Sequence, residues 1–187
     1  MDNILELLYK RGAILTGHFL LSSGLHSDTY IQCAQVSQYP EDNNFLAREI
    51  ASNFEDKEID LVVGPAIGGI LIAYEVARVL NTRNIFAERE MGALTFRRGF
   101  FIKENERVLI VEDVITTAGT VKELKELVTS YGGNVVGIGS IVKRGDVEDL
   151  DGIPIRSLLY LPLSVYYPSE CPLCKENIPI IKPGSKK

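Results

Sequence analysis

The chain has 187 residues, which is enough for one domain of ordinary size and too few for two. Hydrophobic residues make up 45% of it and charged residues 24%, which excludes a disordered chain, a collagen-like repeat and a long coiled coil. The net charge of -5 argues against unspecific binding to nucleic acid or to an anionic membrane, so any phosphate must be bound by a local site.

The first third of the chain predicts two short helices around an extended segment. Four apolar residues between Ile4 and Leu8 have helical spacing, which predicts an amphipathic helix over residues 2–10. Residues 17–36 carry Gly, Ser and Asp between short β-prone pieces and predict a turn-rich flap. A second helix is expected over residues 41–53, after a proline.

The middle of the chain alternates apolar strands with helices. Short apolar runs predict buried strands at residues 59–66, 84–88, 107–114 and 134–142, with helices at 67–80 and 121–133. Residues 89–102 predict a hairpin or a mobile loop. The order of the elements predicts an α/β fold with a central, mostly parallel sheet flanked by helices.

The prolines of the last 40 or so residues predict an irregular ending, apart from a strand near residues 156–160. We therefore expect a single domain over residues 1–187. Its core would take about residues 40–150, and a small hood would be formed by about residues 12–36 and 153–187.

Three features predict a cytoplasmic protein. Cys33, Cys171 and Cys174 are too few and too unevenly spaced for a disulfide framework. The N-terminal segment has acidic residues within its apolar stretch and no small-residue cleavage site, unlike a signal peptide. No apolar run reaches the roughly 18 residues that a membrane-spanning helix needs.

The clearest chemical motif follows the strand R-V-L-I-V. Glu112 and Asp113 are expected at its carboxyl end, and T-T-A-G-T follows directly at a helix start. Small residues let the backbone curl around a phosphate, while carboxylates accept hydrogen bonds from a ribose diol or coordinate Mg²⁺ through water. The turn has no lysine and only one glycine, so it matches neither the Walker nor the dinucleotide pattern. The combination predicts a sugar phosphate site.

The string E-D-V-I-T-T-A-G-T resembles the phosphoribosyl diphosphate signature of the type I phosphoribosyltransferases. The motif S-S-G-L-H-S-D-T-Y-I at residues 22–31, the block G-P-A-I-G-G at 64–69, F-A-E-R-E at 86–90 and V-K-R-G at 142–145 are similar, in order, to the orotate phosphoribosyltransferases of that family. The resemblance implies transfer of ribose 5-phosphate from phosphoribosyl diphosphate to orotate, in pyrimidine synthesis. It also implies Mg²⁺ and a homodimer. The acidic net charge predicts no nucleic-acid or membrane partner.

The resemblance further implies roles for particular residues. Residues that would bind phosphoribosyl diphosphate are Glu112, Asp113, Val114, Ile115, Thr116, Thr117, Ala118, Gly119 and Thr120. Asp113 is also expected to be catalytic. Thr116 and Arg144 would face orotate, whose carboxylate suits the planar donor fork of an arginine. Mg²⁺ would be bound mainly through the substrate diphosphate, and no protein metal ligand is expected.

The chain departs from better-known members of the family at positions that contact the diphosphate. They carry a lysine where this chain has Ser22 or Ser23, and another where it has Gly68 or Gly69. Their mobile loop carries lysines and a histidine, whereas this chain has E-M-G-A-L-T-F-R-R-G. Arg89 is the catalytic candidate by position, and Arg97 or Arg98 could replace a missing loop cation across a dimer.

Other interpretations stay open at this point. T-T-A-G-T could be a capped helix start, the enzyme could act on a purine base, or the chain could be a regulator that senses phosphoribosyl diphosphate without catalysis. His18 and His26 have no visible partner and are expected to be polar flap residues. C-P-L-C at residues 171–174 has no second cysteine pair, which favours two plain thiols over a zinc site shared between subunits.

Overall fold

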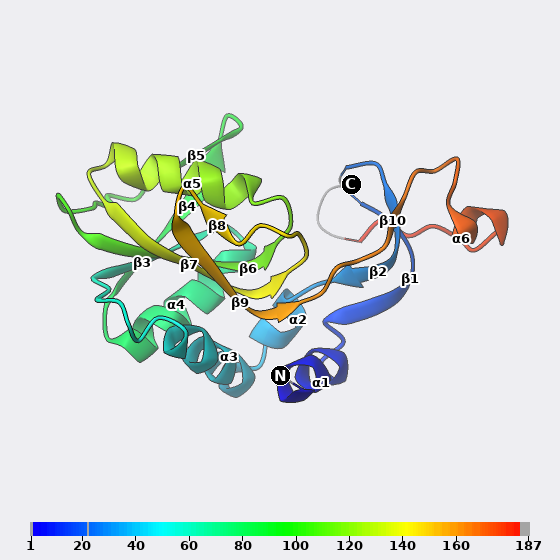
Figure 1. Ribbon diagram of the computed structural model, residues 1–187, viewed down its shortest axis with the longest axis horizontal. Helices are drawn as coiled ribbons and strands as arrows, with labels where there is room; N and C mark the ends of the chain where they lie inside the picture. Colours follow the sequence, from blue (N-terminus) through cyan, green and yellow to red (C-terminus); the bar gives the residue numbers. More distant parts are fainter. Residues whose placement is uncertain (1, 22, 184–187) are drawn as a thin grey trace.

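The computed structural model describes residues 2–21 and 23–183, and its strands form a large and a small sheet (Figure 1). The large sheet contains, in spatial order, β5 (Ala93–Thr95), β4 (Arg83–Glu90), β3 (Leu61–Pro65), β6 (Arg107–Ile115), β7 (Asn134–Lys143), β9 (Ile153–Tyr160) and β8 (Asp149–Leu150). Strands β4, β3, β6, β7 and β9 run parallel, and β5 and β8 add antiparallel edges. The predicted mostly parallel central sheet is confirmed.

Helices cover both faces of the large sheet (Figure 1). The structure contains α1 (Asp2–Lys10), α2 (Ala34–Ser37), α3 (Pro40–Ser52), α4 (Gly68–Leu80), α5 (Gly119–Ser130) and α6 (Pro172–Lys175). Successive residues of β3 face opposite sides of the sheet. Val62 packs in the core with α3 and α4, whereas Leu61 and Val63 pack in the core with α5. Because both faces are covered, these strands are apolar throughout. No helix in the described ranges combines the length and hydropathy needed to span a bilayer.

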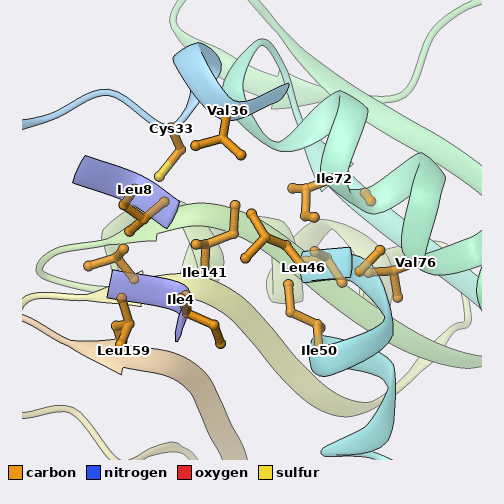
Figure 2. Close-up of a cluster of buried hydrophobic side chains, with 14 of the residues drawn as sticks. Ile4, Leu8, Cys33, Val36, Leu46, Ile50, Ile72, Val76, Ile141 and Leu159 are labelled. Carbon is orange, nitrogen blue, oxygen red and sulfur yellow. The ribbon is translucent and has the colours of Figure 1, made fainter. Parts of the chain in front are cut away.

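Figure 2 shows the core in which the N-terminal helix meets the large sheet. Ile4 and Leu8 of α1 are buried there with Ile141 of β7 and Leu159 of β9. Full burial of one such side chain stabilises the fold by about 1.5–3 kcal/mol. The predicted amphipathic helix is therefore confirmed, and its apolar side holds it against the core.

The small sheet, which we call the hood, contains β1 (Ile14–Leu20), β2 (His26–Ile31) and β10 (Val165–Tyr166), all antiparallel. It lies beside the large sheet, and the segment after β9 runs across to it (Figure 1). The flap expected over residues 17–36 is thus largely regular. Ser22 and residues 184–187 lie outside the described residues.

The expected C-terminal boundary of the hood was wrong. Residues 153–160 were assigned to the hood, but they form β9 of the large sheet, paired with β7 from Ile138 opposite Ile155. Ile155 and Leu159 are buried in the cores of its two faces. The apolar alternation of this strand fits the large sheet, so only the chain beyond it contributes to the hood.

The order of the strands places a crevice between β3 and β6. From β3 the chain passes through α4 to β4 on one side, and from β6 it passes through α5 to β7 on the other side. Neighbouring parallel strands whose connections diverge leave a crevice at their carboxyl ends, where α/β proteins bind ligands. The motif that begins at Glu112 lies at this crevice.

Candidate active site

A small pocket opens at the carboxyl end of β6, in the segment that connects this strand to α5. It is lined by Glu112, Val114, Ile115, Thr116, Thr117, Ala118, Gly119, Thr120 and Val121. The side chains of Ile115 and Ala118 are buried in the core, whereas Thr116, Thr117 and Thr120 are exposed. The threonine hydroxyls and the backbone of this loop are therefore the groups available to a ligand.

The start of α5 has the geometry of an anion site. Ala118 at its N-cap has φ 60° and makes no side-chain cap, so the loop does not follow the capped helix start considered above. An alanine in the left-handed region costs about 1–2 kcal/mol, and such strain concentrates at functional sites. Because the first N–H groups of a helix lack intrahelical acceptors, they can donate to a phosphate here.

Two adjacent carboxylates stand beside this loop. Glu112 is buried, and its Oε1 accepts a hydrogen bond from the Asp113 N–H at 3.1 Å. Asp113 is half-buried, and its Oδ1 accepts from the Val114 N–H at 2.8 Å. Burial, and then the neighbouring Asp113 charge, raise the pKa of Glu112 well above its usual range. The ionised form of Glu112 is therefore disfavoured in the folded protein, and a ligand hydroxyl or a cation could stabilise it.

We expect Glu112→Gln to raise the thermal stability of the ligand-free protein at neutral pH. The folded state binds the Glu112 proton more tightly than the unfolded state, so the contribution of Glu112 to stability falls as pH rises above about 4.3, until the raised pKa is passed. The side-chain amide of the variant does not titrate, so the variant lacks this pH-dependent loss of stability. Thermal unfolding between pH 4 and 9 checks the result, with exposed Glu126→Gln as the control. Parallel wild-type and Glu112→Gln curves would contradict it.

Two glycines let neighbouring loops approach β6 closely. A Cβ at Gly68, at the start of α4, would lie 2.6 Å from Oδ2 of Asp113. A Cβ at Gly145, after β7, would lie 2.4 Å from the carbonyl oxygen of Thr116. Both distances are shorter than real contacts allow. At Gly145 the close atom is backbone, so this position requires glycine, whereas at Gly68 the Asp113 carboxylate would have to move. The loops after β3, β6 and β7 therefore converge on one site. Gly145 belongs to the V-K-R-G motif, but the sequence predicted no role for it.

Arg144 lies between the large sheet and the hood. Its backbone N–H donates to Ile115 O at 2.8 Å, which fixes it beside the end of β6. The side chain is half-buried, and its Nε is buried with no hydrogen-bond partner within the described part of the chain. Burial lowers the pKa of Arg144, and Tyr30 of the hood opposes this shift from nearby. An arginine stays charged, so a partly dehydrated cation lies next to the end of β6.

Arg89 is placed differently. It lies in the β4–β5 hairpin, which confirms the hairpin expected in this region, and its guanidinium forms two bonds to the Glu123 carboxylate of α5, at 2.8 and 3.2 Å. Glu123 also accepts the Leu94 N–H at 2.7 Å. Arg89 is therefore held against α5, outside the set of residues that line the pocket.

The two histidines were expected to be polar flap residues with no visible partner, but the structure places them in contact with each other. His18 and His26 are buried and lie 2.9 Å apart through Nε2 and Nδ1. Sulfur atoms of Cys171 and Cys174 lie beside them. Antiparallel pairing of β1 with β2 and the return of the C-terminal segment bring the four residues together, away from the β6 loop.

A wider pocket lies at the opposite, amino-terminal edge of the large sheet. Several of its charged groups are paired within the protein: Arg83 binds Glu106 at 2.7 Å, and Asp60 binds Arg107 at 2.7 Å. The carboxyl-terminal edge has the uncapped start of α5 and the Arg144 Nε that lacks a partner among residues 2–21 and 23–183, so it is the better candidate for the active site.

Comparison with known proteins identifies the family of this chain. The model of the phosphoribosyl transferase domain matches residues 35–159. An orotate phosphoribosyltransferase of a Thermoanaerobacter species is 54% identical over 100% of this chain and 98% of its own length. That of Thermotoga maritima is 50% identical, over 98% of both chains.

Solved structures show the same fold. Orotate phosphoribosyltransferase from Aeropyrum pernix superposes with a TM-score of 0.70 and 26% identity, over 84% of this chain and 93% of its own. UMP synthase from Leishmania donovani gives a TM-score of 0.73 and 26% identity, over 85% of this chain and 36% of its own. The converging loops, the uncapped start of α5 and these similarities agree that the chain belongs to the orotate phosphoribosyltransferases of the phosphoribosyl transferase family.

Proposed function

We propose that the protein transfers the phosphoribosyl group of 5-phosphoribosyl 1-diphosphate to orotate, giving orotidine 5'-phosphate and diphosphate. The observation that supports this substrate best is Arg144, whose buried Nε lacks a partner among the described residues. Orotate offers a carboxylate that an arginine fork can bind through two parallel hydrogen bonds. Thr116, whose carbonyl faces Gly145, is close enough in the fold to contribute to the same subsite.

The residues of the β6 loop suit the other substrate. Backbone N–H groups and threonine hydroxyls between Thr116 and Thr120 would bind the 5-phosphate, and Glu112 and Asp113 would accept hydrogen bonds from the ribose hydroxyls. Positive charge builds on the anomeric carbon as the diphosphate departs, and the carboxylates stabilise it. Catalysis then needs positioning and electrostatic stabilisation, with no side-chain nucleophile.

The site also fits Mg²⁺. This ion prefers hard oxygen ligands, retains several waters and usually binds through one or two carboxylates together with substrate phosphates. Asp113 keeps Oδ2 unbonded to described protein groups, and Glu112 lies next to it. We propose that these two residues orient the ion through waters and ribose oxygens while the diphosphate supplies the main ligands. When bound, Mg²⁺ would neutralise charge on the departing diphosphate.

We expect Arg89→Ala to lower kcat strongly and leave the fold intact. Arg89 is proposed to contact the diphosphate once the hairpin releases it from Glu123. The matched control is Glu123→Gln, which weakens the ion pair and retains the arginine. Steady-state kinetics should show a large fall for Arg89→Ala and a small change for Glu123→Gln. Equal falls in both variants would mean that the pair only positions the hairpin, and unchanged kinetics would remove Arg89 from the mechanism.

Arg97 and Arg98 are the other cations of this region. They form exposed pairs with Glu88 and Glu90, with Arg98 at 3.1 Å from Glu88 and Arg97 at 3.5 Å from Glu90. Exposed ion pairs contribute about 0–1 kcal/mol, so a diphosphate could compete for these arginines. We propose that one of them replaces the loop lysine of other family members.

We also propose a homodimer. Ile67 at the N-cap of α4, and Leu71 and Tyr74 within the helix, are exposed, with 82%, 52% and 56% of their surfaces accessible. Their spacing of four and three residues places them on one stripe of the helix. An exposed apolar stripe beside an active site is typical of a protein interface. A symmetric contact through α4 would bury it.

Turnover tests decide the substrate. The purified full-length protein is incubated with phosphoribosyl diphosphate, Mg²⁺ and one of orotate, uracil, hypoxanthine or adenine, and nucleotide formation is followed. We expect product with orotate alone. Turnover of a purine without turnover of orotate would overturn the proposal, and binding of phosphoribosyl diphosphate without any turnover would favour a regulator.

A further inference from the structure

We propose that His18, His26, Cys171 and Cys174 bind a structural Zn²⁺ ion that holds the hood together. These four side chains, which we call the His–Cys cluster, place one ligand atom each within 4.8 Å of all the others. Two thiolates and two imidazoles are a ligand set typical of structural zinc, and Cys-x-x-Cys is its usual cysteine spacing. This cluster is separate from the β6 loop and from the Mg²⁺ chemistry proposed there.

The distances within the cluster match a tetrahedral site. Zinc bonds of about 2.0–2.1 Å to nitrogen and about 2.3 Å to sulfur give N···S edges of about 3.5 Å and N···N edges of about 3.3 Å. Sulfur atoms lie 3.5 and 3.7 Å from Nε2 of His18, and 3.3 Å separates Sγ of Cys174 from Nδ1 of His26. The two ring nitrogens are 2.9 Å apart, so only a small separation is needed.

Hydrogen bonding alone does not account for this arrangement. His18 Nδ1 lies 2.7 Å from the Ile178 carbonyl oxygen, to which it donates its proton. Nε2 of the neutral ring then offers a single lone pair, yet His26, Cys171 and Cys174 all point potential donors at it. This single lone pair can accept a hydrogen bond from only one of the three residues. A cation at the centre instead accepts a lone pair from every member.

The contact with Ile178 is itself typical of a metal site. A ligating histidine usually donates its second ring N–H to a carbonyl or carboxylate, which fixes the tautomer and the ring orientation. The C-terminal segment is also bonded to β1 here, because the Ile181 N–H donates to His18 O at 2.8 Å and Leu20 N–H donates to Ile181 O at 2.9 Å. The first histidine is thus oriented by the segment that supplies both cysteines.

The C-terminal side of the hood makes few apolar contacts. Its third strand, β10, has two residues, and Val165, Ile180 and Ile181 are 45–57% exposed. The cysteines of the cluster are free thiols, so no disulfide holds this side. The proposed ion would connect β1, β2 and the segment around α6 in one step, and its binding would contribute directly to the folding of the hood.

Metal content tests the proposal directly. Full-length protein produced with zinc in the medium and kept reduced is dialysed, and its metals are measured by mass spectrometry. We expect about one zinc per chain in the wild type and a loss to about a tenth or less in Cys174→Ser and His26→Ala. Cys33→Ala is the matched control, because this buried thiol lies outside the cluster and should retain the metal.

A second measurement remains decisive if a variant fails to fold. Wild-type protein stripped with a chelator is titrated with Co²⁺, which should give the visible spectrum of tetrahedral cobalt and a thiolate charge-transfer band at one equivalent. Hydrogen exchange of the stripped protein should increase in β1, β2 and β10 and stay unchanged in β3, β6 and β7. Wild-type protein with less than about a tenth of a zinc per chain and no cobalt spectrum would overturn the site, as would full zinc content in both ligand variants.

Discussion

Replacing Arg144 with alanine should lower kcat/KM for orotate by about 10- to 100-fold and leave binding of phosphoribosyl diphosphate unchanged. Hydrogen bonds to a charged partner contribute about 1.5–3 kcal/mol, and each 1.4 kcal/mol is a factor of ten. Thermal stability should not fall, because the buried Nε of Arg144 has no partner within the described residues. Steady-state kinetics with each substrate varied measure kcat/KM for orotate and the effect on phosphoribosyl diphosphate. Thermal unfolding measures the stability.

Two further variants sharpen this test. Arg144→Lys keeps the charge and loses the planar fork, so it should recover only part of the activity. Arg156→Ala removes an arginine that bonds Asp56 at 2.7 Å, outside the residues that line the β6 pocket, and should affect stability more than the KM for orotate. If Arg144→Ala kept a wild-type kcat/KM for orotate, the assignment of this arginine to the base subsite would be wrong.

Replacing Gly145 with alanine should lower kcat/KM by about 100-fold for both substrates together. The added Cβ would lie 2.4 Å from the Thr116 carbonyl oxygen, and a backbone atom in a loop after a buried strand cannot rotate away. The loop would have to shift, and a displacement of about 1 Å at a catalytic site costs on the order of 100-fold. Arg144, its direct neighbour, would move with it. Steady-state kinetics and circular dichroism check the result.

The matched control for this variant is Gly119→Ala. Its Cβ would lie 3.6 Å from Oγ1 of Thr117, an ordinary contact, so the apo protein should keep its thermal stability. Gly145→Ala should lower the unfolding temperature measurably, because overpacking typically costs about 1–3 kcal/mol. Full activity and stability in Gly145→Ala would show that the loops after β6 and β7 can separate without loss.

The large sheet could be predicted because its physical cause is local. Strands buried on both faces must be apolar throughout, as Val108 to Val111 are, and the helices between them carry their own periodicity. The predicted start of the C-terminal hood segment, near Pro154, was wrong for a specific reason. Pro154 pairs with Asp149 of the two-residue β8, and pairing with β7 begins only at Ile155, so its missing N–H does not interrupt the main ladder.

The sites could be predicted only in part. The β6 loop is continuous in sequence, and Glu112 to Thr120 were identified from it and from a family resemblance. Arg144 had no local signal and rested on the resemblance alone. The His–Cys cluster was missed because its members come from β1, β2 and a segment more than 140 residues later. The four residues come together because β1 pairs with β2 and the C-terminal segment returns to lie beside them. No local sequence pattern encodes either arrangement.

The path of the chain after β9 has a consequence for synthesis. β1 and β2 leave the ribosome early, but β10 and the segment from Cys171 to Ile181, which bond to them, are made almost last. The strands of the large sheet can assemble beforehand, since chains fold progressively as they emerge. The nascent protein would therefore carry a formed β6 loop while the hairpin of β1 and β2 still lacks β10 and the C-terminal segment. Premature termination after β9 would leave that hairpin without its neighbours, which exposes strand edges that favour aggregation.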